Sequence, residues 1–107
     1  MIKRDLIKII NERAQIIARK EAEEWARAGE ENLDKIVELD FTLEINGKKY
    51  LIGGDIHYTA DIEFEDVNVF EDCYERQFTI STFNYEIGNV ALIDNDNNEF
   101  SLETLKL

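Results

Sequence analysis

Residues 39–52 read LDFTLEINGKKYLI, and this stretch predicts a β-hairpin. Hydrophobic residues alternate with polar ones on both sides of Asn46-Gly47, which is the period of strands with one buried face. Asn-Gly is a strong signal for a two-residue type I′ turn, because both central residues need a positive φ. A turn at this point places apolar residues opposite apolar ones and Glu44 opposite Lys49, so the register and the pattern agree.

The same alternation continues beyond the hairpin, with apolar residues at even positions from Tyr50 to Phe64. A straight strand of this length would extend about 50 Å, whereas a domain of this size has a radius of gyration of about 13 Å. We therefore expect the chain to bend. A bulge at Gly53-Gly54 keeps the apolar residues on one face, whereas a second tight turn there would oppose apolar to polar residues.

The last third of the chain adds further strand patterns. Residues 76–87 read RQFTISTFNYEI, and the parity of their apolar positions changes near Ser81-Thr82, which predicts a second bulge or a twist. Residues 90–93 and 100–102 form a final pair around a polar loop. In total the sequence predicts an antiparallel sheet of about five strands.

The N-terminal part of the sequence has the period of a helix instead. Over residues 2–28 good helix formers surround an apolar stripe, Gly29 follows as a C-cap, and residues 33–37 offer another short helical stretch. The stripe consists of Leu6, Ile10, Ala14, Ile17 and Trp25. The prediction is a single two-layer α+β domain over 1–107, with a helical part at 1–38 and the antiparallel sheet at 39–107.

Three isoleucines extend the apolar arc of this helix beyond what one sheet needs. Ile2, Ile9 and Ile16 follow each other at intervals of seven residues beside the main stripe. Exposing them would forgo roughly 1.5–3 kcal/mol each, so some cover is expected. The sheet or the C-terminal residues Leu105 and Leu107 could supply it. The alternative is a two-fold homodimer in which these helix edges meet.

The charge of the chain limits the classes of partner. The 107 residues hold 12 Lys and Arg against 24 Asp and Glu, a net charge of −12. Residues 40–107 account for −11 of this, with 4 basic and 15 acidic residues. Direct binding to a nucleic-acid backbone is therefore not expected. Charges throughout the chain also argue against a membrane span, which needs about 20 apolar residues.

The expected cellular compartment follows from two features that the sequence lacks, a secretory signal pattern and a second cysteine. Its start has no uninterrupted apolar stretch of the kind that a secretory signal requires, since Asp5 and Lys8 interrupt it. Cys73 is the only cysteine, so an internal disulfide cannot form. We expect a cytoplasmic protein.

Acidic residues dominate the strand and loop that follow the glycines. Between Asp55 and Glu75 there are eight carboxylates and no Lys or Arg. This row can be a solvated sheet face, or it can dock a basic protein partner, since a patch of one sign steers association. The expected partner-binding residues are Asp55, His57, Asp61, Glu63, Glu65, Glu71 and Asp72. We expect a non-catalytic interaction or regulatory protein, with a DNA-mimic inhibitor of a nucleic-acid-binding protein as an alternative.

A catalytic alternative rests on the only histidine. His57 lies two residues from Asp55 on the same strand face. With Asp55 it could serve as the general base of a small hydrolase. No second histidine completes a metal site, and carboxylates beside Cys73 disfavour its thiolate. We therefore expect no enzyme activity, no metal and no cofactor.

The sequence Asp94-x-Asp96-x-Asn98 begins like a calcium-binding loop. It lacks the glycine and the glutamate that an EF-hand requires at its sixth and twelfth positions, where Glu99 and Leu105 stand instead. The interpretation is a polar hairpin loop.

Overall fold

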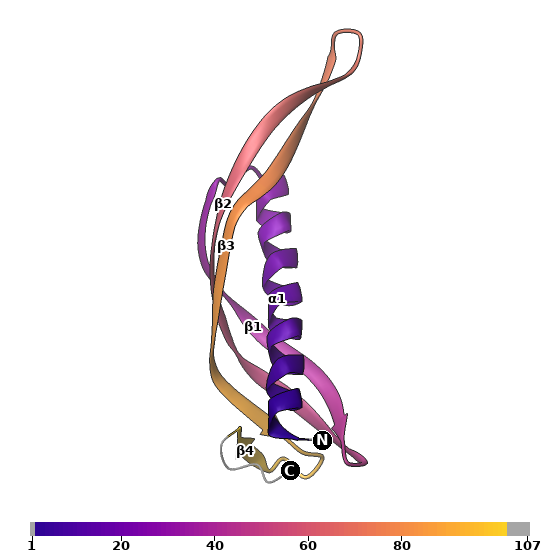
Figure 1. Cartoon of the computed structure of the whole chain (residues 1–107), viewed down its shortest axis with the longest axis vertical. Helices are drawn as coiled ribbons and strands as arrows, with labels where there is room; N and C mark the ends of the chain where they lie inside the picture. The colour runs from indigo at the N-terminus through magenta and orange to yellow at the C-terminus, as the bar shows by residue number, and fades with distance from the viewer. Residues whose placement is uncertain (1, 103–107) are drawn as a thin grey trace.

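A computed structural model describes residues 2–102 and shows one helix packed on one open antiparallel sheet (Figure 1). The expected α+β fold is confirmed. The sheet has four strands in the order β1-β2-β3-β4, so each strand pairs with its neighbour in the chain. The elements are α1 (Lys3–Arg27), β1 (Asn32–Ile45), β2 (Lys48–Phe70), β3 (Cys73–Ile93) and β4 (Glu99–Ser101).

The predicted hairpin is confirmed in both turn and register. Asn46 and Gly47 connect β1 to β2 with φ values of 51° and 82°, as a type I′ turn requires. Glu44 pairs with Lys49 across the two strands, and Leu43 with Tyr50 on the opposite face. This hairpin therefore sets which residues of β1 and β2 face the helix.

The molecule is elongated, unlike the compact domain expected from its length. Its principal extents are 61 × 24 × 23 Å and its Cα radius of gyration is 18.2 Å. β2 runs through 23 residues without interruption, and its far end extends with β3 beyond the helix (Figure 1). The long strand β2 therefore fits because the whole molecule is rod-shaped and because the strand bends.

Bulges lie at both predicted places. The register of β2 against β3 shifts between Gly53 and Asp55, and the additional residue lies on β3, near Asn89 with its φ of 56°. A second shift leaves Ser81 unpaired opposite the step from Asp61 to Ile62. Both bulges keep the apolar residues of β2 and β3 on the helix side of the sheet.

The number of strands and the start of the sheet differ from the prediction. Residues 76–87 and 90–93 belong to the single strand β3, because the ladder continues on both sides of the bulge near Asn89, so the sheet has four strands instead of about five. Residues 33–37 are not helical. They lie in β1, where Asn32 pairs with Asp61, because a partner strand is available along the whole stretch.

The buried stripe of α1 follows a period of four. Its members are Leu6, Ile10, Ala14, Ala18, Ala22 and Ala26. Because a helical turn has about 3.6 residues, such a row winds obliquely around the helix and can follow a twisted sheet. Ile17 is only partly buried, and Trp25 lies at the margin of the core with 36% of its surface exposed and Lys35 Nζ 3.8 Å from its ring centre.

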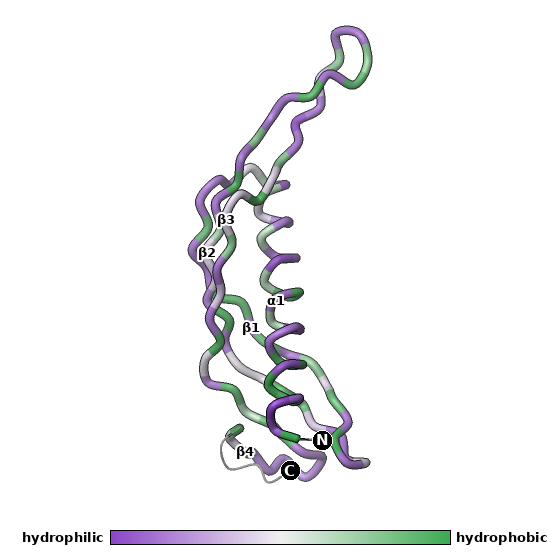
Figure 2. The backbone as a smooth tube through the Cα atoms, viewed as in Figure 1, coloured by the Kyte–Doolittle hydropathy of each residue, from purple (hydrophilic) through white to green (hydrophobic). Residues whose placement is uncertain are grey.

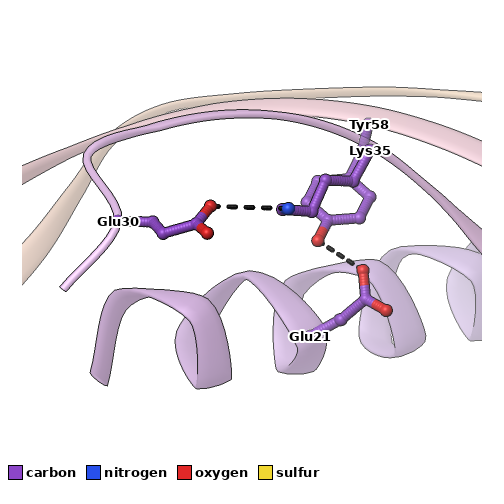
Figure 3. Close-up of polar contacts among 4 residues, drawn as sticks. All are labelled: Glu21, Glu30, Lys35 and Tyr58. Atoms are coloured by element: carbon purple, nitrogen blue, oxygen red, sulfur yellow. Dashed lines mark hydrogen bonds and ion pairs between the residues drawn. The ribbon is translucent and has the colours of Figure 1, made fainter. Parts of the chain in front are cut away.

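Small residues on the helix face large ones on the sheet. Tyr58 is fully buried in the core, and its hydroxyl donates a hydrogen bond to Glu21 of the helix (Figure 3). Lys35 of β1 forms an ion pair with Glu30 at 3.4 Å nearby, in the segment that leads from α1 to β1. The first contact joins the C-terminal half of the helix to β2, and the second joins the segment after the helix to β1.

Candidate functional site: the uncovered face of the sheet

The helix covers one face of the sheet, and among residues 2–102 no element covers the other face. Alternate residues of each strand point to this outer face, because the side chains of a strand alternate between its two sides. Cross-strand pairing continues the face over three strands. We call it the acidic face, since its outward carboxylates are Asp34, Glu38, Asp40, Glu44, Asp55, Asp61, Glu63, Glu65, Glu75 and Glu86.

Few positive charges oppose these carboxylates. In the described part of the chain, Lys49 is the one lysine or arginine on this face, next to Glu44 at the hairpin end. His57 lies near its middle and is exposed. The basic residues of β1 and β3, Lys35 and Arg76, lie on the helix side. The face therefore carries a nearly uniform negative charge.

The structure brings five of the seven predicted partner-binding residues together. Asp55, His57, Asp61, Glu63 and Glu65 are all exposed and share the outer side of β2.

The other two predicted residues lie elsewhere. Glu71 and Asp72 form the turn between β2 and β3, at the far end of the hairpin. Sequence reasoning missed the four carboxylates that β1 adds to the face. The alternation of acids along 34–44 is visible in the sequence, but only the pairing of β1 with β2 places them beside Asp55.

Asp55 and His57, the suggested catalytic pair, have different hydrogen-bond partners on the face. Asp55 accepts a hydrogen bond from Asn89 Nδ2 at 3.0 Å. His57 Nε2 instead contacts Asp34 Oδ1, from the neighbouring strand. A shallow hollow of about 330 Å³ lies beside His57, with Thr59 and the β3 residues 84–86 along its wall. The geometry supplies an Asp34–His57 pair on an open surface.

One pair of carboxylates is directly opposed. Glu38 of β1 is the cross-strand partner of Asp55 on β2, and both are exposed. Like charges directly opposite each other on a sheet destabilise it. The fold therefore retains an unfavourable contact in the middle of the acidic face.

Past the end of β1 the hairpin of β2 and β3 continues as two strands alone. We call residues 63–79 the arm, since the pairing of β1 ends at Asn32 opposite Asp61. Near its tip Val69, Phe70 and Tyr74 are 55%, 69% and 65% exposed. Neither this apolar tip nor the arm itself was predicted from the sequence.

A cleft of about 510 Å³ lies at the base of the arm, against the end of α1. Phe64 and Phe78, which pair across β2 and β3, line it together with Arg27 and Arg76. Arg76 stacks over the Phe64 ring, with its guanidinium carbon 4.0 Å from the ring centre. Glu75 and Gln77 also line the cleft, which therefore combines two aromatic rings with two arginines and one carboxylate.

The remaining candidates form no site within residues 2–102. Cys73 is a free, exposed cysteine at the tip of the arm, and no cluster of three or more potential metal ligands is present in this part of the chain.

The carboxylate of Asp94 accepts hydrogen bonds within its own loop. It accepts hydrogen bonds from the backbone N–H of Asn98 and Asp96, both at 2.9 Å. These bonds, above all the one from Asn98, lower the pKa of Asp94 below its usual range. The loop 94–98 is therefore a polar turn held by its first residue, as predicted.

The isoleucines of the predicted dimer edge remain largely uncovered. Ile2 and Ile16 are 53% and 62% exposed, and Ile9 is partly buried. Leu105 and Leu107, which could cover them, lie outside the described residues. The helix-edge dimer therefore stays a prediction.

Comparisons with known proteins add no family. No protein-family model, curated protein or solved structure matches this chain. Within residues 2–102, α1 is too polar to cross a membrane.

Proposed function

We propose that this protein is a small, non-catalytic interaction or regulatory module that binds a basic protein partner through its acidic face. The observation that carries the proposal is the outer side of the sheet, where ten carboxylates from three strands stand against one lysine. A surface of one sign raises the local potential and steers an oppositely charged partner toward it. The lone, free Cys73 fits a reducing compartment, so we place this activity in the cytoplasm.

The direct opposition of Glu38 and Asp55 supports a functional origin of the charge. Replacing either residue by a basic one would relieve the repulsion, and a sheet selected only for stability would gain from such a change. The presence of a carboxylate at both positions in this chain supports the use of this surface for binding.

A DNA-mimic inhibitor is a special case of the same proposal. The carboxylates of β2 at positions i and i+2 lie about 6.8 Å apart along the strand. The β2 row from Asp55 to Glu65 spans ten residues, about 33 Å along the strand. A partner that binds nucleic acid would place the protein in this class.

The experiment is affinity capture from a cell lysate with three forms of the immobilised protein. The first form is the wild type. The second neutralises three carboxylates of the acidic face, and the third neutralises three exposed carboxylates elsewhere, so that the two variants have the same net charge. The face variant carries Asp55→Asn, Glu63→Gln and Glu65→Gln, and the control carries Glu12→Gln, Glu24→Gln and Glu31→Gln.

We expect a basic protein to be retained by the wild type and by the control. After purification it should bind the face variant about tenfold more weakly. It should be released near 1 M salt, where the Debye length is about 3 Å. Displacement of the captured protein from nucleic acid would identify the DNA-mimic case. Equal capture by both variants, or capture of nothing basic at low salt, would overturn the proposal.

A further inference from the structure

The arm lacks the third strand and the helix layer that stabilise the rest of the sheet. Beyond the pair of Asn32 and Asp61, β2 and β3 pair only with each other and extend past the helix (Figure 1). A two-stranded hairpin alone is at best marginally stable in water. Its inner side, which continues the helix-facing side of the sheet, carries the pair of Phe64 and Phe78 near the base and Tyr74 near the tip.

The tip of the arm combines apolar and acidic residues. Val69, Phe70 and Tyr74 are all more than half exposed there, and Glu71 and Asp72 form the turn between them. Figure 2 shows hydrophobic segments in this loop, far from the core. Exposed aromatic residues of this size are typical of contact surfaces.

The cleft at the base of the same arm has the complementary chemistry. Arg76 and Arg27 lie over the rings of Phe64 and Phe78, with guanidinium carbons 4.0 and 5.8 Å from the ring centres. Arg27 also forms a long ion pair within the helix, with its Nη2 4.0 Å from Glu23 Oε2. In a chain with a net charge of −12, these two arginines give the cleft a charge opposite in sign to that of the tip, although Glu75 also lines it.

We propose that the occupant of the cleft is the arm tip of a second copy of this chain, in a reciprocal two-fold dimer. Tyr74, on the inner side of the tip, packs on the aromatic rings of the other copy's cleft. The carboxylates of Glu71 and Asp72 meet the arginines at its rim. Because each chain has one tip and one cleft, both contacts form at once and the assembly closes.

The dimensions of the arm permit this arrangement. Seven residues separate Phe64 at the cleft from Glu71 at the tip, a distance of about 23 Å along a strand. Two arms lying antiparallel with their inner sides in contact therefore place each tip at the other base. The two-fold axis then passes near the middle of the arm, between the cross-strand pair of Val67 and Glu75 and that of Asn68 and Tyr74.

This contact is expected to be reversible. A stable interface buries about 800 Å² on each partner, and one side of a two-stranded arm is smaller than that. Two bodies of charge −12 also repel each other, but at about 0.15 M salt the Debye length of about 8 Å screens most of this. The dimer leaves both acidic faces free, so the inference stands independently of the proposed function.

Charge reversal provides a test with its own internal control. One variant reverses the tip, with Glu71→Lys and Asp72→Lys, and another reverses the rim of the cleft, with Arg27→Glu and Arg76→Glu. We expect the wild type to show a concentration-dependent dimer in sedimentation equilibrium at about 0.15 M salt. Each variant alone should be monomeric, because like charges meet at both contacts.

Mixing the two variants should restore a one-to-one heterodimer, detected by native mass spectrometry. The reversed tip then meets the reversed rim, and the unchanged tip meets the unchanged rim. A further variant, Tyr74→Ser, changes a side chain that is 65% exposed, so it should weaken the dimer at least tenfold without altering the circular dichroism of the monomer.

Three results would overturn the proposal. The first is a wild-type monomer that persists at roughly 1 mM, the concentration at which even a weak contact is half occupied. The second is a dimer that the charge reversals and Tyr74→Ser leave intact. The third is a dimer that dissociates on Ile9→Glu with Ile16→Glu, since this would place the interface on the helix edge.

Discussion

At the scale of single residues, the opposed carboxylates of Glu38 and Asp55 lead to a prediction about stability. Glu38→Lys replaces a repulsive cross-strand pair by an attractive one, so it should raise the free energy of unfolding by about 0.5–1 kcal/mol. Urea denaturation measures this change. Glu99→Lys, with the same change in net charge but with Ile93 as its cross-strand partner, is the control. An equal gain in both variants would show that only net charge matters.

Tyr58 is the second residue with a measurable consequence. Burial, the hydrogen bond to Glu21 and the charge of that carboxylate raise the pKa of Tyr58 above its ordinary value of 10.0. In the unfolded chain the phenol ionises near pH 10, whereas in the folded protein it stays protonated to a higher pH. Its contribution to stability is therefore constant below pH 10 and falls as the pH rises above that value.

Tyr58→Phe tests this pH dependence. The variant loses the hydrogen bond to Glu21 and should be less stable by about 1 kcal/mol at pH 8. The difference between wild type and variant should shrink between pH 10 and pH 11.5, as measured by urea denaturation at each pH. A difference that stays constant over this range would contradict the raised pKa of Tyr58.

At the scale of the elements, the bulge between β2 and β3 makes opposite predictions for two adjacent glycines. A Cβ atom on Gly54 would lie 3.0 Å from the carbonyl oxygen of Gly88 and 3.4 Å from the Cα of Val90. Gly54→Ala should therefore destabilise the protein by about 1–3 kcal/mol. At Gly53 the nearest such atom is the carbonyl oxygen of Leu39, at 3.8 Å.

Gly53→Ala is the matched control for this position. It fits ordinary van der Waals contact and removes a flexible residue from a strand, so its stability should be unchanged or higher by about 0.5 kcal/mol. Chemical denaturation of both variants decides the matter. Equal loss of stability in the two would mean that the bulge does not bring the backbone of β3 close to Gly54.

At the scale of the whole molecule, shape is the property to measure. Small-angle scattering of a dilute sample should give a radius of gyration near the 18.2 Å of the structure, instead of the value of about 13 Å typical of a compact domain of this length. Replacing residues 67–75 by Asn-Gly, which joins the cross-strand partners Asp66 and Arg76, should lower it, because the arm contributes to the long axis. A wild-type value near 13 Å would show that the arm folds back on the body.

Local spacing in the chain was enough to predict several elements. The hairpin at Asn46-Gly47, the bulge at the glycines, the change of parity at Ser81 and the long N-terminal helix all follow from periods of two and 3.6 and from turn chemistry. The acids of β2 could be assigned to one exposed face for the same reason. Each of these features depends on residues that are near one another in the sequence.

The features that sequence reasoning missed depend on which distant segments meet. Residues 33–37 become a strand because β2 lies beside them, and that pairing adds the carboxylates of β1 to the acidic face. The helix buries Ala18 and Ala22 because the twisted sheet follows an oblique row, while Trp25 is left at the margin. The arm exists because β1 ends before β2 and β3 do, and the free energy of such pairings is set by tertiary contacts that no local pattern contains.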